Sequence, residues 1–249
     1  MCRALPITVL AGLLAAIGAL VPVEASAQAL NLDLGDGGSS TSRIIQILAL
    51  LTVLSLAPSI LVMVTAFIRI VVVLSFLRSA IGMQQTPPNA VIIALALFLT
   101  GFVMTPTFEA AYRDGIQPLI EEQITEKEAF TRSTVPVHQF MMRQVRQQDL
   151  ALFVDLSGGG AIAQPEDTPL TALIPAFMIS ELRRAFEIGF LLFLPFLIID
   201  MVVASILMSM GMMMLPPIVI SLPFKLIFFV LVDGWYLVVG SLVRSFAAA

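Results

Sequence analysis

Three ionisable side chains interrupt the apolar sequence near the C-terminal end of this 249-residue chain, namely Asp200, Lys225 and Asp233. A full charge at the centre of a lipid bilayer costs roughly 2.5 to 3.5 kcal/mol on insertion scales, so such side chains need ionic partners, water or a protein interior. Charges in this setting can carry protons or ions through a transporter, and they can equally fix the packing of helices. We therefore expect protein to be assembled around this segment.

The depths of Asp200 and Lys225 along their helices decide whether these two residues can pair. They lie on opposite arms of an expected hairpin, 15 residues before Leu215 and 9 residues after Pro216. At 1.5 Å per residue, straight helical arms place them at depths that differ by roughly 9 Å. Pairing within one hairpin, between neighbouring copies or with Arg69 is compatible with the sequence, and so is either a structural salt bridge or a role in gating.

Methionines gather in the turn between these two arms. They are Met210, Met212, Met213 and Met214. Gly211 and the prolines Pro216 and Pro217 disfavour regular helix there, so we expect a loop that presents thioethers, with these three residues as its hinges. Flexible, unbranched side chains can close a passage against one another or deform around an unfolded chain. The alternative is that the methionines only fill gaps between packed helices.

The chain carries none of the sequence patterns typical of serine hydrolases, zinc proteases or P-loop nucleotide hydrolases. Its one histidine, His138, has no second histidine to share a metal, and its one cysteine, Cys2, lies in a segment that we expect to be removed. Thiolate and histidine metal sites are therefore not expected. We predict a protein without enzymatic activity, cofactor or bound metal.

The composition is that of a membrane protein. Hydrophobic residues make up 59% of the chain, charged residues only 12%, and the mean hydropathy is +1.00. No soluble core could bury that much apolar surface. The net charge of -4, without a long cluster of lysine and arginine, argues against nucleic acid as a partner and against a polybasic lipid anchor.

Apolar runs and their interruptions predict an all-α chain of five segments. These are a signal peptide at 1–27, a flexible tether at 28–43, an N-terminal apolar hairpin at 44–106, a helical extracytoplasmic insert at 107–171 and a C-terminal apolar hairpin with the methionine turn at 172–249. An uncleaved first membrane helix is the alternative to the signal peptide. In the first hairpin, Pro58 and Arg69 predict a kinked helix to about residue 64 and a continuation that packs on protein.

Each hairpin turns at a Pro-Pro pair, at 87–88 and at 216–217, which hints at an internal repeat. Asn89 is expected to cap the helix that follows the first pair, and that helix is expected to end at Pro106. The insert carries ten acidic and five basic side chains and is expected to lie outside the cytoplasm. Its periodicity predicts helices at 121–132 and 136–156.

Several long blocks of this sequence resemble the FliP/SctR family of type III export gates. The blocks are 175–190, 196–200, 211–217, 222–226 and 232–235 in the C-terminal hairpin, with 67–70 and 85–89 in the N-terminal one. The resemblance covers about residues 56–246. An N-terminal signal peptide is more typical of the flagellar branch of that family than of the virulence-secretion branch.

The resemblance implies a pore-forming core component of the flagellar export gate, which passes unfolded flagellar subunits across the inner membrane. It also implies several copies of the chain joined by FliQ and FliR, with FlhB and FlhA below, in membrane lipid and with much of the mass on the periplasmic side. In that family the methionine loops form a gasket, a role carried over here to Met210, Met212, Met213 and Met214. The alternative is a secondary transporter with Asp200, Lys225 and Arg69 as an ion or proton relay.

Overall fold

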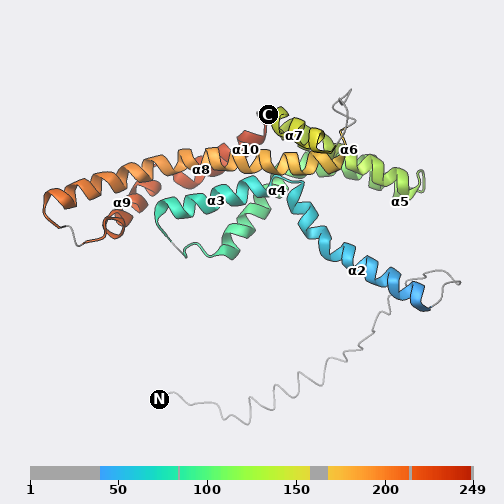
Figure 1. The fold of residues 1–249 in the computed structure, drawn as a ribbon, viewed down its shortest axis with the longest axis horizontal. Helices are drawn as coiled ribbons and strands as arrows, with labels where there is room; N and C mark the ends of the chain where they lie inside the picture. Colours follow the sequence, from blue (N-terminus) through green and yellow to red (C-terminus); the bar gives the residue numbers. More distant parts are fainter. Residues whose placement is uncertain (1–39, 84, 158–167, 213–214, 248–249) are drawn as a thin grey trace, which may run out of the picture. The chain divides into compact units, whose positions relative to one another are not determined.

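A computed structural model describes residues 40–83, 85–157, 168–212 and 215–247, and within these ranges the chain forms helices and turns without a strand (Figure 1). The expectation of an all-α fold is confirmed. The chain divides into two units, 1–51 and 52–249, and of the first unit only residues 40–51 are described. The expected signal peptide at 1–27 and most of the expected tether lie outside the described residues.

Helix α2 (Ser40–Met63) and helix α3 (Phe67–Ile81) are separate, as the interruption near residue 64 predicted. Helix α2 begins at Ser40, so the expectation of a flexible tether is wrong for residues 40–43. Serine and threonine, which occupy positions 40–42, are favoured at helix starts, and a long helix extends readily by one more turn. Helix α3 ends at Ile81 and is capped by Gly82, whose φ of +92° suits glycine.

Helix α4 (Asn89–Ala111) corrects two expectations. It runs through Pro106 instead of ending there, and it continues into a π-helical turn, η1 (Tyr112–Ile116), and a short helix, α5 (Gln117–Ile120). Proline removes only one hydrogen bond of the helix, and the packing of α4 against α3 and α6 compensates for that loss. Asn89 does not cap α4, because its side chain accepts a hydrogen bond from Arg78 on the other side of the turn.

The insert forms helix α6 (Glu126–Gln144) and helix α7 (Gln147–Leu156), so the predicted break near residues 133–135 is wrong. Thr125 caps α6 by accepting a hydrogen bond from the backbone N–H of Glu128. The break lies at Val145 and Arg146, where the backbone is extended and the N–H of Arg146 donates to the Ser180 hydroxyl at 3.1 Å. A tertiary hydrogen bond, and not Pro136, therefore separates these helices.

Helix α8 (Leu170–Ser209) is continuous over 40 residues, with Pro175 and Pro195 inside it. Helix α9 (Pro217–Leu231) and helix α10 (Gly234–Ala247) follow, bent by 63° relative to one another. The second arm of the C-terminal hairpin is therefore broken between Leu231 and Gly234. Within the described residues, Ile44–Met63, Asn89–Ile120 and Leu170–Ser209 are long and apolar enough to cross a membrane, and the bent pair α9 and α10 would be a fourth span.

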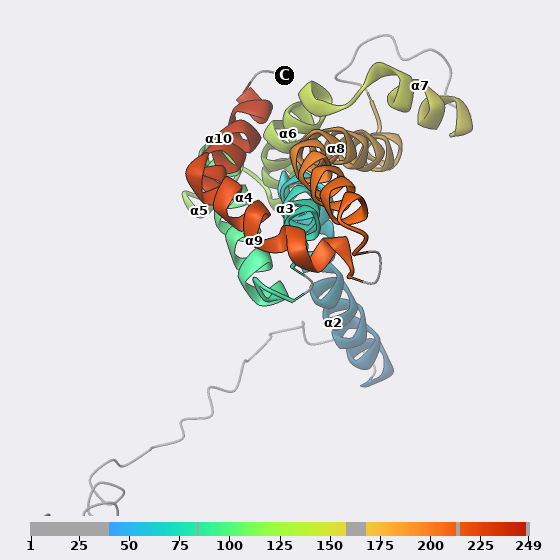
Figure 2. The same ribbon diagram turned by 90° about the vertical axis from the view of Figure 1, so that its left-hand side faces the viewer.

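Helix α3 is the centre of the second unit. Figure 2 shows it between α4 and α8, and both helices contact it, as does α9. The contacts show that helices α3 and α8 run parallel. Arg69 of α3 contacts Glu181 of α8, and Phe76, about two turns after Arg69, lies against Gly189, about two turns after Glu181. A Cβ atom at Gly189 would come within 2.6 Å of the Phe76 ring, so this close approach requires glycine.

Candidate functional site

The methionine turn begins where α8 ends, at Ser209. Gly211 has a φ of +73°, and the N–H groups of Gly211 and Met212 donate to the carbonyls of Met208 and Leu207 at 3.1 and 3.0 Å. This is the Schellman arrangement, in which glycine takes the left-handed position and satisfies the last carbonyls of the helix. Met210 and Met212 are 66% and 41% exposed, so the turn presents their thioethers outward.

The other hinge residues end the turn. Pro216 has an extended backbone and Pro217 is the first residue of α9, a position at which proline lacks only an N–H that would be unpaired anyway. Met213 and Met214 lie outside the described residues. The 82–88 turn shares the order Gly-Met-x-x-x-Pro-Pro with residues 211–217, and both glycines have positive φ. This likeness supports the hypothesis of an internal repeat.

Asp200 and Lys225 form an ion pair within one chain. The Lys225 ammonium donates to Oδ2 of Asp200 at 2.6 Å and to the carbonyl oxygen of Ala80 at 3.2 Å. The Ser221 hydroxyl donates to the other carboxylate oxygen of Asp200. The Lys225 side chain is only 3% exposed, so its charge is balanced inside the protein, as a buried ammonium requires.

The expected difference in depth between these two residues is wrong because the turn is longer on its α8 side than assumed. Asp200 lies nine residues before the end of α8 at Ser209, and Lys225 lies eight residues after the start of α9 at Pro217. The two helical arms are thus almost equal in length, which places the side chains level with one another. The sequence left three pairings open, and the structure shows the pairing within the hairpin.

Arg69 does not join this pair. Its side chain is fully buried and forms a two-pronged ion pair with Glu181, with Nε at 2.8 Å from Oε2 and Nη2 in contact with Oε1. Gln144 Oε1 accepts from Nη2 at 2.9 Å, and Ser245 accepts from Nη1 through its hydroxyl at 3.0 Å. The ring of Phe246 stacks 3.8 Å from the guanidinium carbon. Burial lowers the pKa of Arg69 below its ordinary value, and the hydrogen bond and charge of Glu181 offset only part of that shift.

This second cluster therefore joins four helices, α3, α6, α8 and α10, around one guanidinium. The side-chain amide of Gln144 also donates to the backbone carbonyl of Phe246 at 3.1 Å, so the cluster secures the last turn of α10. Glu181 and Gln144 were not predicted as site residues. The signal for Glu181 was present, since it is an acidic residue in a segment that becomes apolar on both sides.

Asp233 has no ion pair among the described residues and has a different position from the other three charges. It is exposed, it has a φ of +51°, and its carbonyl accepts from the N–H of Leu237 at 3.1 Å, so it forms the corner between α9 and α10. Gly234 follows because a Cβ atom there would lie 2.1 Å from the Phe229 ring. Phe229 meets Trp235 edge to face at 5.5 Å, which holds the corner.

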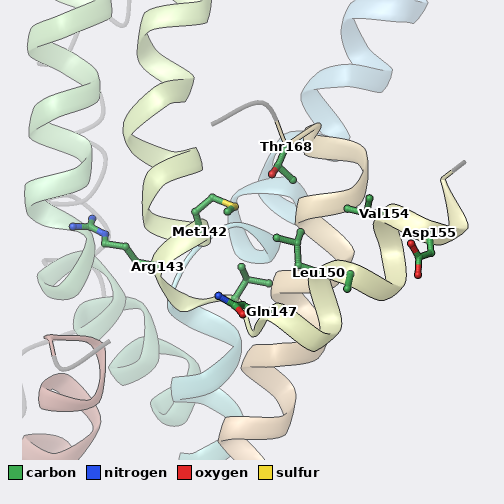
Figure 3. A pocket seen from close by; sticks show the side chains of 9 residues that line it. Met142, Arg143, Gln147, Leu150, Val154, Asp155 and Thr168 are labelled. Atoms are coloured by element: carbon green, nitrogen blue, oxygen red, sulfur yellow. The ribbon is translucent and has the colours of Figure 1, made fainter. Parts of the chain in front are cut away.

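A groove of about 700 Å³ lies beside the break between α6 and α7 (Figure 3). Its floor is apolar, with Met142, Val145 and Leu150, and the buried hydroxyl of Thr168 lines it without a hydrogen-bond partner in the described part of the chain. His138 is close by and its Nε2 lies 2.9 Å from the carbonyl oxygen of Thr168. In the ranges that the structure describes, no three metal-ligating side chains come together.

Fold and site together define a class of protein: an all-α chain of apolar helical hairpins, whose charges at Arg69 and Lys225 are neutralised by carboxylates of the same chain. Comparison with known proteins adds the family. The FliP family model matches residues 50–242. The chain is 62% identical to the flagellar biosynthetic protein FliP of Caulobacter vibrioides, over 98% of this chain and 91% of the relative.

Two further relatives carry the same name. The FliP protein of Rhizobium meliloti is 56% identical over 84% of this chain and 86% of its own length, and that of Bacillus subtilis is 55% identical over 83% and 94%. The chain belongs to the FliP family, as the blocks of its sequence predicted. It is therefore related to proteins of flagellar biosynthesis.

Proposed function

We propose that this chain is a core pore-forming component of the flagellar type III export gate, through which unfolded flagellar subunits cross the inner membrane. The observation that carries the proposal is the combination of FliP family membership with a hairpin whose tip is a methionine turn on a base of buried, paired charge. A chain that lines a passage needs a deformable tip on a rigid support, and this hairpin supplies both.

The methionine turn would be the seal. Thioether side chains adapt their shape at little cost, so a ring of them can close on itself and still yield to polypeptides of any sequence. Met210 and Met212 project from the end of α8 into the surroundings of the chain, where they are available to such a ring. Gly211, Pro216 and Pro217 confine the break in helix to the tip, so that the arms stay regular.

Several copies would be needed to enclose a passage, and the surface of the single chain supports this part of the proposal. The hairpin leaves large apolar side chains exposed, including Met201, Ile206, Ile218 and Val219. Apolar surface of this extent is stable only against lipid or against other chains. In the proposed complex, copies of this chain, FliQ and FliR cover it, while FlhB and FlhA lie below and membrane lipid surrounds the rest.

The acidic insert would lie on the periplasmic side, behind a cleaved signal peptide, and no catalytic step belongs to this chain. The transporter alternative needs Arg69, Asp200 and Lys225 on one path for protons or ions. Arg69 is instead paired with Glu181, and Lys225 with Asp200, in two separate clusters. Each of these two ion pairs joins different helices, and neither leaves a charge without a partner. This arrangement favours a structural role for the charges over an ion or proton relay.

Replacement of Met212, Met213 and Met214 together by alanine tests the seal. The expected result is intact assembly, a raised passive leak of ions and slower export of flagellar subunits, because three flexible side chains are lost from the tip. Met201→Ala is the control, since Met201 is also an exposed methionine but lies on the arm of the hairpin. An unchanged leak in the triple variant, measured in cells that assemble the complex, would contradict the proposal.

A further inference from the structure

The hairpin of α8 and α9 extends well beyond the helix on which it packs. Because α3 and α8 run parallel and Phe76 lies beside Gly189, the end of α3 at Ile81 is level with about residue 194 of α8. Helix α8 continues to Ser209, which is a further 15 residues and roughly 22 Å. Beyond that level only Phe196 and Leu207 of α8 are buried. The outer part of the hairpin is therefore an overhang.

Beyond the ion pair of Asp200 and Lys225, the overhang carries no charge. Residues 201–224 include no aspartate, glutamate, lysine or arginine, while Asp200 precedes them and Lys225 follows them. The ion pair thus lies at the base of an uncharged tip, with one residue on each arm. The ion pair therefore lies near the boundary between the part of the hairpin that packs on α3 and the part that extends beyond it.

Lys225 does more than neutralise Asp200. An ammonium has three donors, and a second one goes to the carbonyl oxygen of Ala80, in the last turn of α3. The carboxyl end of a helix carries partial negative charge and unpaired carbonyls, so a cation is favourable there. Gly82, at the start of the 82–88 turn, is also beside the ammonium, since a Cβ atom built on it would lie 3.9 Å from Nζ.

We propose that Lys225 is a positioning residue that clamps the base of a movable hairpin. Its ammonium fixes α9 and, through Asp200, α8 to the carboxyl end of α3, and the parts of α8 and α9 beyond this clamp move when the passage opens. Ser221 completes the clamp by orienting the second carboxylate oxygen of Asp200. This inference rests on the proposed function for what the motion achieves, but the clamp itself is a property of the single chain.

The clamp is tested by distances between spin labels in the full-length chain with Cys2→Ser. One label replaces Ser79, which is exposed near the end of α3, and the second replaces either Met208 on the overhang or Glu187 on the supported part of α8. The variant is Asp200→Asn with Lys225→Met, because removing both charges leaves no unpaired ion to unfold the protein. Lys225→Arg, which keeps a cation, is the conservative control.

We expect a narrow distribution of the 79–208 distance in the parent chain and in Lys225→Arg. In the double variant the detached population should rise about 10- to 100-fold, which corresponds to the loss of one hydrogen bond from a charged donor. The 79–187 distance should not change. A 79–208 distribution that is unchanged in the double variant would overturn the clamp, and so would an equal broadening of both distances, because Lys225 would then hold the fold and not the tip.

These distances do not depend on export, so the two proposals can fail separately. A broadened 79–208 distance in Asp200→Asn, Lys225→Met, together with an unchanged ion leak in the methionine variant, supports the clamp and counts against the channel. A leak in the methionine variants with an unaltered 79–208 distance in Asp200→Asn, Lys225→Met supports the seal and overturns the clamp.

Discussion

Glu181→Leu should destabilise this protein far more than the loss of an ordinary salt bridge. The substitution keeps a side chain of similar size but removes the carboxylate that neutralises Arg69, which is fully buried. Removal of one partner of a buried ion pair costs about 3–5 kcal/mol, because the other charge stays uncompensated. Arg69 keeps hydrogen bonds to Gln144 and Ser245, so we expect the lower end of that range, about 3 kcal/mol.

The assay is thermal unfolding of the purified full-length chain in detergent, followed through the fluorescence of Trp235, the single tryptophan. For a chain of this length 1 kcal/mol corresponds to roughly 2–4 °C in Tm, so a loss of about 3 kcal/mol should lower Tm by roughly 6–12 °C. Trp235 packs on Phe229, so its fluorescence reports on the corner of α9 and α10.

Two controls show whether the cause is the unpaired charge. Glu187→Leu breaks the exposed pair with Arg183 on the same helix, at 3.0 Å, and should cost no more than about 0.5 kcal/mol. Arg69→Met combined with Glu181→Leu should recover most of the lost stability, because a buried pair can be replaced by apolar side chains at little cost. Equal Tm values for Glu181→Leu and Glu187→Leu would refute the reasoning, as would a double variant less stable than Glu181→Leu.

Two further predictions concern glycines. Gly211→Ala places a Cβ at a φ of +73° and should cost about 1 kcal/mol, measured as a fall in Tm of roughly 2–4 °C, whereas Gly101→Ala, in open space inside α4, should not lower Tm. Equal effects at the two positions would show that the left-handed backbone at Gly211 does not matter. Gly234→Ala brings a Cβ within 2.1 Å of the Phe229 ring and should shift Trp235 fluorescence and lower Tm, while Gly240→Ala meets no atom within 4 Å and should do neither. An unshifted spectrum in Gly234→Ala would mean that the corner of α9 and α10 adapts freely.

Much of the architecture could be predicted because its signals are local. The apolar runs and the break near residue 64 each depend on a few neighbouring residues, and the structure confirms them. The helix ends that were predicted wrongly depend on contacts between residues that are distant in the sequence. Helix α4 continues through Pro106 because it packs on other helices, and α6 ends at Gln144 because Arg146 bonds to Ser180 of α8.

The pairing of charges was beyond sequence reasoning for a related reason. Whether Asp200 meets Lys225 depends on how many residues the turn takes from each arm, and a shift of a few residues changes the depth by several ångström. Arg69 and Glu181 are 112 residues apart, and nothing in the spacing of either residue identifies the other. Only the parallel packing of α3 on α8 brings them together.

The order of residues by itself determined that this chain is helical, apolar beyond the capacity of a soluble core, and broken at glycine and proline into hairpins that carry isolated charges. Local backbone preferences and the cost of exposing apolar surface are sufficient for those conclusions. The tertiary structure alone decided which charge neutralises which, and that Lys225 reaches the end of α3 as well as Asp200. A hydrogen bond between helices requires their relative depth and direction, and these arise from the packing of the whole core.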